Sequence, residues 1–332
     1  MIEEKLGSKI VVIGGGTGSF TLLNGLKHYA RNITALVNMA DDGGSTGHLR
    51  DELGVLPPGD IRQCLVALSD NPRVRELFNY RFDEGSLKGH AFGNLFLTAL
   101  EKMTGNFGHA VELAGQVLNI TGQVEPITLA DVTLCAEGSD GDELKGEFKI
   151  SQASLKPRPR VWLEPSAQAN PAALQAIEEA DLVIIAPGSL YGSLAPALVV
   201  DGIGQALQKT KAKRIYVSNL VTKPGQTEGF DVTDFAAEIE RLAGGPFLDY
   251  VIYNTLKPPK DLMERYAHEG EYLVELDQPK AENLNYQLSG RPILAKGGWG
   301  EAQAADEISA TRSFIRHDSD AVARAIMRLY FD

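Results

Sequence analysis

The sequence predicts an α/β protein built on a doubly wound, mainly parallel sheet with helices on both faces. Apolar, β-rich runs alternate with segments of helical periodicity along most of the 332 residues. The run at 182–186, Leu-Val-Ile-Ile-Ala, is continuously apolar, which is typical of a parallel strand that is buried on both faces. A glycine-rich loop also follows the first predicted strand and leads into a helix. We expect a single α/β domain over residues 1–332, without an internal repeat.

The first half of the chain predicts two strands with a helix between them, a long helical stretch and a hairpin. A strand at 9–15 is followed by a helix at 18–30 and a second strand at 32–39. Pro58 and Asp60 mark the start of a helix, and the pattern stays helical over about 61–120. We interpret this stretch as a helical insert between strands of the sheet. Residues 130–150 alternate around a Ser-Asp-Gly-Asp turn and predict a β-hairpin.

The second half returns to strand–helix alternation. The predicted elements are a helix at 170–180, a strand at 181–188, a helix at 196–210, a strand at 214–221, a helix at 232–244, a strand at 249–255 and a last helix at 319–331. This order is that of a parallel sheet with crossover helices.

Composition and charge exclude several classes of function. The net charge is −12, and no basic run points to nucleic acid. No apolar stretch approaches the ~20 residues of a membrane span, and the first residues form a short tail rather than a signal peptide. We therefore expect a cytoplasmic protein. Cys64 and Cys135, the only two cysteines, lie in apolar settings and are interpreted as buried small hydrophobic residues rather than as a disulfide or zinc pair.

The first glycine loop predicts a phosphate site. Its residues are Gly14, Gly15, Gly16, Thr17, Gly18 and Ser19. Gly14 and Gly16 fit the G-x-G-x-x-G/A pattern with Ser19 as its last small residue, whereas a P-loop is excluded because no Gly-Lys-Ser/Thr follows. Glycines let the backbone approach a phosphate, and a helix N-terminus directs N–H groups and a positive dipole end at it. The alternative is a tight strand-to-helix turn without a ligand.

A second glycine loop follows the second predicted strand. Its candidate ligand-binding residues are Asp41, Asp42, Gly43, Gly44, Ser45 and Arg50. Asp41 is suitably placed for a ribose hydroxyl, but a dinucleotide site gives no reason for a second glycine loop. Two adjacent carboxylates beside an anion-binding loop suit Mg²⁺ on a phosphate. The alternative is that Asp41 caps a turn and Asp42 points to solvent, while Arg50 either opposes a phosphate or pairs with Asp51 or Glu52.

Further candidates stand at the ends of later strands and helices. Gly188 and Ser189 lie in a third loop, which either binds the ligand or only connects a strand to a helix. Asp60 either caps its helix or reaches the ligand, and Asn94, near His90, is either a helix cap or a ligand contact. Asn219 follows another strand.

Seven motifs in one order resemble the YvcK group of the YvcK/CofD superfamily. They are GGGTG, DDGGSTGHLR, ELGVLPPGDIRQCLVALSD, GHAFGNLFLTAL, ADVTLCAE, APGSLYGS and SNLVTKPGQTEGF, and the likeness runs from about residue 9 to 330. Each motif alone is weak, but seven in register are specific. His48 and Lys223 depart from the residues that we expect at their positions, and we therefore interpret Lys223 as a surface lysine.

The resemblance implies a Rossmann-like fold and a ligand. It implies that the chain binds UDP-N-acetylglucosamine and acts in carbon metabolism and cell shape, as a gluconeogenesis factor does. The CofD branch is similar but enzymatic, and moves a phospholactyl group from a nucleotide diphosphate carrier onto a deazaflavin with Mg²⁺. Aspartates that match Asp42 and Asp60 look like metal ligands in that branch.

Three functions therefore compete. The first is a nucleotide-sugar-binding regulator without turnover, and the second is a Mg²⁺-dependent transferase acting on a nucleotide diphosphate-linked substrate. The third, an NAD(P) oxidoreductase, lacks a Tyr-x-x-x-Lys or histidine-based pair for hydride transfer, so no redox cofactor is expected. Apolar faces in the 61–120 insert suit a homodimer.

Overall fold

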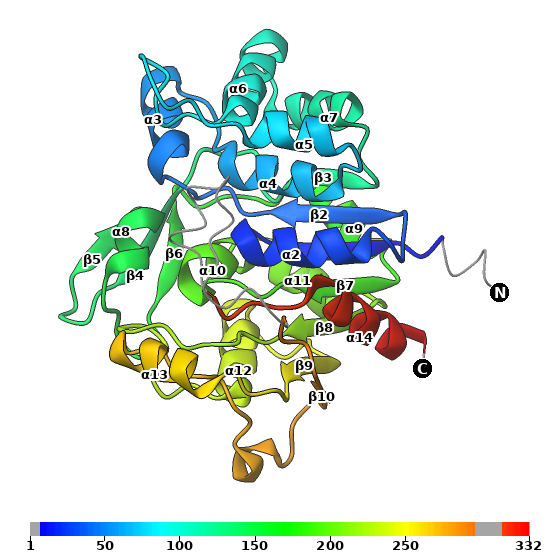
Figure 1. The fold of residues 1–332 in the computed structure, drawn as a ribbon, viewed down its shortest axis with the longest axis vertical. Helices are drawn as coiled ribbons and strands as arrows, with labels where there is room; N and C mark the ends of the chain where they lie inside the picture. The colour runs from blue at the N-terminus through cyan, green and yellow to red at the C-terminus, as the bar shows by residue number, and fades with distance from the viewer. Residues whose placement is uncertain (1–6, 296–313, 332) are drawn as a thin grey trace.

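A seven-stranded parallel sheet forms the centre of the molecule (Figure 1). The computed structural model describes residues 7–295 and 314–331, so most of the short tail expected at the amino terminus lies outside it. The strands are β1 (Ile10–Gly14), β2 (Ile33–Val37), β3 (Gln123–Pro126), β7 (Leu182–Ile185), β8 (Lys213–Val217), β9 (Tyr250–Asn254) and β10 (Gln287–Arg291). They pair in the order β10-β9-β8-β7-β1-β2-β3, and every pair is parallel. The predicted α/β fold class is confirmed.

The strand order reverses between β1 and β7. The chain builds outward from β1 through β2 to β3, and then returns to β7 on the other side of β1. Both strands are apolar and fully buried, with Ile10 opposite Leu182 and Ile13 opposite Ile185. In a doubly wound sheet, ligands bind beyond the carboxyl ends of the strands at such a reversal. The first and third glycine loops leave the sheet at this point.

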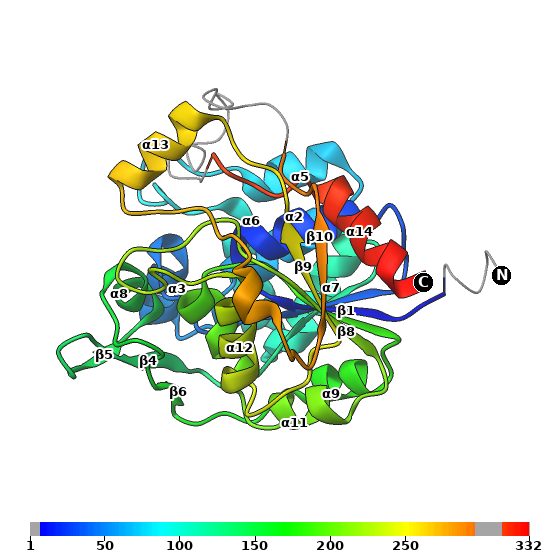
Figure 2. The same ribbon diagram turned by 90° about the horizontal axis from the view of Figure 1, so that it is seen from below.

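Helices cover both faces of the sheet (Figure 2). One face carries α2 (Gly16–Leu26), α4 (Gly59–Leu68), α7 (Phe107–Leu118) and α14 (Ser319–Phe331), and the other carries α9 (Pro171–Glu178), α11 (Ile203–Lys209) and α12 (Val232–Leu242). Apolar side chains of α2 and α14 are buried where these two helices pack together, among them Leu22, Leu26 and Ile326.

The helical insert between β2 and β3 is confirmed. It comprises α3 (Gly44–Leu53), α4, α5 (Pro72–Asn79), α6 (Phe92–Thr104) and α7. It begins earlier than expected, because the second glycine loop itself enters α3. Phe78 of α5 packs edge-on against Phe92 and Phe96 of α6, which holds these two helices together.

The predicted hairpin belongs to a second, antiparallel sheet of order β5-β4-β6, made of β4 (Thr133–Glu137), β5 (Glu143–Lys145) and β6 (Val161–Glu164). The end of the predicted hairpin is instead a short helix, α8 (Glu147–Gln152). In Figure 1 this sheet and α8 lie beside α3, next to the carboxyl edge of the large sheet.

Two predicted helices have other boundaries. The helix expected at 18–30 already begins at Gly16, so the glycine loop supplies its first turn. The helix expected at 196–210 is broken into a π-helical turn (Leu190–Leu194), α10 (Ala195–Leu198) and α11. Gly202, at φ +99°, and a bridge between Gln168 and Asp201 interrupt it. The elements that were not predicted include β3, β6, α13 (Lys260–His268) and β10.

Over the described ranges, 7–295 and 314–331, every helix is too short or too polar to cross a bilayer. The structure buries both Cys64 and Cys135 as free thiols, as the sequence indicated.

Candidate functional site

The first and third glycine loops touch at the reversal of strand order. A Cβ on Gly18 would lie 1.6 Å from the carbonyl oxygen of Pro187, so only glycine permits the first turn of α2 to pack against the third loop. Asn219, at the end of β8, holds the same loop from the other side. Its amide donates to the carbonyl of Gly188 at 2.7 Å and its oxygen accepts from the Tyr216 hydroxyl at 2.9 Å.

Two helices begin at the first and second glycine loops without side-chain caps. The residue before α2 is Gly15 and the residue before α3 is Gly43, and neither helix start receives a side-chain hydrogen bond at its N-cap. By contrast, α5, α7, α9 and α12 each begin at an asparagine or aspartate whose side chain caps the helix. Uncapped helix starts keep N–H groups and a positive dipole end available for an anion.

Asp60 lies in the first turn of its own helix, α4, but its side chain is directed at the start of α2. Its Oδ2 atom is 2.3 Å from the point where a Cβ of Gly15 would stand. Burial, and then the charge of Asp41, raise the pKa of Asp60 to about 7, against the lowering effects of the Gly16 N–H and Arg62. The helix-cap alternative is wrong, because no side chain caps α4. A cation beside this carboxylate would stabilise its charged form.

Asp41 and Asp42 face inward in different ways. Asp41 accepts a hydrogen bond from the Gly43 N–H at 3.0 Å, as the turn-capping alternative predicted. Burial is the main cause that raises the pKa of Asp41. Asp42 does not point to solvent: its Oδ1 accepts from the N–H of Phe148 at 2.8 Å and so caps α8 from a distant segment.

Glu147, the first residue of α8, joins these aspartates and was missed by the sequence analysis. Burial, and then the charges of Asp41, Asp60 and Asp42, raise its pKa to about 8. Its Oε1 lies 2.5 Å from the point where a Cβ of Gly192 would stand. No local pattern marks Glu147, because the aspartates that surround it come from residues 87 or more positions earlier in the chain.

Lys223 is a further residue of the candidate site, and its interpretation as a surface lysine is wrong. The side chain is half-buried, and burial lowers the pKa of its ammonium group against the raising effects of Glu147 and Glu271. The sequence gives no sign that Lys223 lies near Glu147, because contacts with α8 determine the position of its loop.

Arg50 pairs with neither Asp51 nor Glu52. Its guanidinium donates to Asp131 at 2.7 Å, to the Val132 carbonyl at 2.8 Å and to the Asp41 carbonyl at 3.0 Å. These bonds fix the second loop, and its binding of a phosphate stays a prediction.

Side chains from other parts of the helical insert contact the hydroxyl of Ser45. Asn94 accepts from Arg62 Nε at 3.0 Å and donates to the Ser45 hydroxyl at 3.1 Å, which also contacts His90 Nδ1 at 3.0 Å. Asn94 is therefore no helix cap, since α6 begins after Ala91 without one. Among the glycines of the second loop, Gly43 is half-buried and Gly44 is exposed.

Two hydroxyls of the loops make no hydrogen bond within the described chain. They belong to Ser19, which is 2% exposed, and Ser189, and both oxygen atoms are buried. Buried polar atoms normally have a partner. Thr17, in the same loop as Ser19, is exposed, while Gly14 and Gly16 have positive φ angles that favour glycine.

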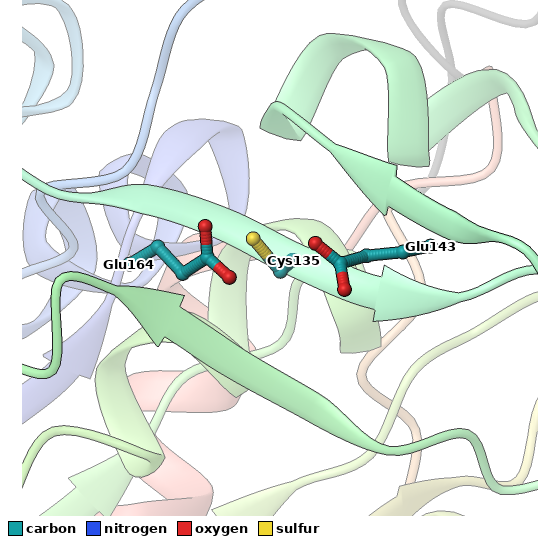
Figure 3. A group of neighbouring side chains, drawn as sticks. All are labelled: Cys135, Glu143 and Glu164. Carbon is teal, nitrogen blue, oxygen red and sulfur yellow. The ribbon is translucent and has the colours of Figure 1, made fainter.

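A compact group of potential metal ligands lies elsewhere, on the small sheet. Cys135, Glu143 and Glu164 point toward one another there (Figure 3). Both carboxylates pair with Lys145, at 3.0 and 2.6 Å. Burial also raises the pKa of the Cys135 thiol to about 11. We interpret the group as a lysine ion pair beside a protonated thiol, not as a metal centre.

A cleft of about 300 Å³ lies at the opposite, amino-terminal edge of the sheet, under α9. Its polar lining includes Lys9, Asn32, Glu125 and Gln175, and no glycine loop reaches it. In doubly wound sheets, ligands bind at the carboxyl edge, which is the edge opposite this cleft.

Comparisons with known proteins agree with this fold and identify the family. A family model described as 2-phospho-L-lactate transferase CofD matches residues 10–294. A Thermotoga maritima relative is 43% identical over 323 residues, which are 97% of this chain and 99% of that protein. A Bacillus subtilis relative named gluconeogenesis factor is 39% identical over 324 residues, 97% of this chain and 98% of that protein. The crystal structure of the Bacillus halodurans protein BH3568, 35% identical, has a TM-score of 0.87 and covers 97% of this chain and 99% of that one. The chain therefore belongs to the CofD family and, within it, to the YvcK group of gluconeogenesis factors.

Proposed function

We propose that this protein binds UDP-N-acetylglucosamine at the carboxyl edge of the large sheet and acts as a regulator of carbon metabolism and cell shape in the cytoplasm. The observation that carries the proposal is the pair of uncapped helix starts, α2 and α3, beside the reversal of strand order. Two such helix starts offer N–H groups to two phosphates of one ligand. The name of the Bacillus subtilis relative supports the regulatory role.

The proposed ligand lies across the three loops. Its diphosphate runs over Gly14–Ser19 and reaches the start of α3, with Asp41 or Asp42 near the ribose or a metal. The third loop, at Gly188 and Ser189, faces the sugar or the distal phosphate. The hydroxyls of Ser19 and Ser189, which have no hydrogen-bond partner among the described residues, are the groups that such a ligand would satisfy.

Mg²⁺ belongs to this proposal on grounds of charge. A diphosphate beside Asp41, Asp42, Asp60 and Glu147 would meet strong repulsion. Mg²⁺ typically binds through one or two carboxylates together with phosphate oxygens and water. Asp60, directed at the start of α2, fits this role best, and Asp42 would have to share its carboxylate with the N–H of Phe148.

Isothermal titration calorimetry tests the binding proposal. Heat of binding is expected with UDP-N-acetylglucosamine in Mg²⁺, and a much weaker signal in EDTA. NAD and GTP serve as competing ligands at the same concentrations. Binding of NAD without binding of the uridine sugar would contradict the proposal.

Asp60 also supports a second candidate, a Mg²⁺-dependent transferase of the 2-phospho-L-lactate transferase type. A buried carboxylate at the phosphate loop suits a metal that neutralises charge on a leaving phosphate. Mass spectrometry of the nucleotide after incubation with candidate acceptors, with and without Mg²⁺, distinguishes the two candidates. Release of a nucleotide product only in the presence of an acceptor and Mg²⁺ supports the transferase, and an unchanged nucleotide in every mixture argues against it.

A further inference from the structure

Lys223 is placed in the site by a loop that is fastened to α8. The buried Gln226 side chain, 5% exposed, donates to the carbonyls of Ile150 at 2.8 Å and Ala153 at 3.2 Å. The N–H of Leu155 donates to the Gly225 carbonyl at 2.7 Å. Because α8 begins with Glu147, these bonds bring the loop that carries Lys223 to the side of that carboxylate.

Glu147 and Ser189 both lie close to Gly192, in the turn that follows the third loop. The point where a Cβ of Gly192 would stand is 2.5 Å from Glu147 Oε1 and 3.1 Å from Ser189 Oγ. The Ser189 oxygen is buried and makes no hydrogen bond within the described chain. The missing side chain of Gly192 therefore leaves the carboxylate and the hydroxyl facing one region.

Neither charged group is saturated by the residues that the structure describes. Glu147 and Lys223 influence each other electrostatically, yet within the described residues neither the carboxylate nor the ammonium makes a side-chain hydrogen bond or an ion pair within 4.0 Å. Half-buried charges usually find a close partner. Both groups retain hydrogen-bonding capacity that a ligand can use.

We propose that Glu147, Lys223 and Ser189 form the recognition site for the sugar end of the nucleotide sugar. Lys223 donates to the phosphate that carries the sugar, since an ammonium group offers only donors. In its ionised form, Glu147 accepts from sugar hydroxyls, since a carboxylate offers only acceptors, and Ser189 completes the set. This inference rests on the proposed function, and it assigns to Glu147 and Ser189 the distinction between the sugar-bearing ligand and a bare diphosphate.

A second cation at Glu147 is the competing explanation. Lys223 argues against it, because an ammonium group beside a carboxylate repels a divalent ion and already compensates part of the negative charge. The two explanations differ in the experiment: loss of a metal ligand weakens binding of UDP and of UDP-N-acetylglucosamine alike, whereas loss of a sugar contact affects only the second ligand.

The test compares UDP with UDP-N-acetylglucosamine by calorimetry at a fixed Mg²⁺ concentration. In Glu147→Gln, the preference for the sugar-bearing ligand over UDP is expected to fall about tenfold, the loss of one charged hydrogen bond. Ser189→Ala is expected to reduce the same preference. Lys223→Met is expected to weaken both ligands about tenfold, because UDP keeps the phosphate. Glu271→Gln, the other half-buried glutamate that faces Lys223, is the matched control and should leave the preference within twofold.

An unchanged preference in both Glu147→Gln and Ser189→Ala would overturn the inference, as would equal losses for the two ligands in Glu147→Gln. Circular dichroism and thermal unfolding of each variant verify folding. Failure of the wild-type protein to bind UDP-N-acetylglucosamine is a separate result, which contradicts the proposed function itself.

Discussion

Four positions of the candidate site require glycine because a carboxylate oxygen occupies the space that a side chain would take. Gly15, Gly59, Gly146 and Gly192 each leave room for a carboxylate oxygen, from Asp60, Asp41, Asp42 and Glu147 in that order. Each oxygen lies 2.3 to 2.6 Å from the point where a Cβ would stand. The glycines thus allow the carboxylates to pack directly against the backbone, in addition to leaving the phosphate loop open. Any larger residue would displace a charged group of the site.

Gly18→Ala is expected to destabilise the protein by about 2 to 3 kcal/mol, a typical cost of overpacking. The added methyl group would collide with the Pro187 carbonyl, which is backbone and cannot move aside alone. Gly188→Ala in the facing loop is the control, since its Cβ would meet neighbours only at 3.6 Å or beyond. Urea unfolding measures both changes. Equal stabilities of the two variants would show that the loops can separate without cost.

His317 is expected to make the protein sensitive to acid. Its Nε2 lies 3.1 Å from the carbonyl of Ser218, and burial lowers its pKa to about 4 from an ordinary 6.5. The unfolded chain therefore binds a proton between pH 6.5 and 4 that the folded chain does not. Stability from this group is complete above about pH 6.5 and falls by at most about 3 kcal/mol as the pH drops to 4.

The variant His317→Gln removes this titration, so its free energy of unfolding should change less between pH 7 and pH 4.5 than that of the wild type. His109→Gln, on the exposed face of α7, is the control and should keep the wild-type slope. Parallel slopes for His317→Gln and the wild type would show that His317 titrates normally.

Sequence reasoning identified the residues that lie on glycine loops and missed those placed by tertiary contacts. Asp60 was identifiable because it starts a helix close to the loops in sequence. Glu147 and Lys223 lie on a short helix and a loop whose positions depend on Gln226 and on the small sheet. No periodicity or motif in either segment encodes that approach.

At the scale of elements, the π-helical turn at Leu190–Leu194 keeps the third loop in place. Its Tyr191 hydroxyl donates to Glu238 of α12 at 2.9 Å, and Glu238, fully buried, also accepts from Arg241 at 2.7 and 2.6 Å. Tyr191→Phe is expected to cost about 1 to 2 kcal/mol, because one hydrogen bond to a buried carboxylate is lost while Arg241 still compensates the charge. Thermal or urea unfolding measures the loss.

Tyr272→Phe is the matched control for that prediction. Tyr272 is 56% exposed, so removal of its hydroxyl should change stability by less than about 0.5 kcal/mol. A Tyr191→Phe protein as stable as this control would mean that Glu238 and Arg241 hold α12 without the tyrosine.

Elements with strong periodicity or continuous apolar runs were predicted well, whereas short elements with polar, irregular sequences were not. The apolar strands β1 and β7 and the amphipathic helices α12 and α14 were confirmed near their expected boundaries. The four-residue strand β3 and the strand β10 were missed, because Gln123–Pro126 and Gln287–Arg291 are polar edge segments stabilised by pairing with β2 and β9. The helix expected at 196–210 is interrupted because α10 ends at Leu198, and α11 begins only after Gly202, its left-handed N-cap residue.

At the scale of the whole molecule, the strand order decides where a ligand can bind. The reversal between β1 and β7 brings two loops, separated by about 170 residues in sequence, into contact. The insert at α3–α7 and the small sheet with α8 each add charged residues to the same edge. The site is thus assembled from three parts of the chain around one topological feature, which the strand and helix order of the sequence predicted only in outline.

Hydrogen exchange tests this placement over the whole chain. Saturating UDP-N-acetylglucosamine with Mg²⁺ is expected to slow exchange in 14–20, 42–50 and 186–194, because their N–H groups lie at the carboxyl edge. Peptides that line the opposite cleft, at 32–34 and 123–125, should be unchanged and form the internal control. The glycine loops are expected to show the largest effect because the N-terminal N–H groups of α2 and α3 lack side-chain caps in the free protein. Protection confined to the amino-terminal cleft would move the binding site across the sheet, and the strand-order argument would then be wrong.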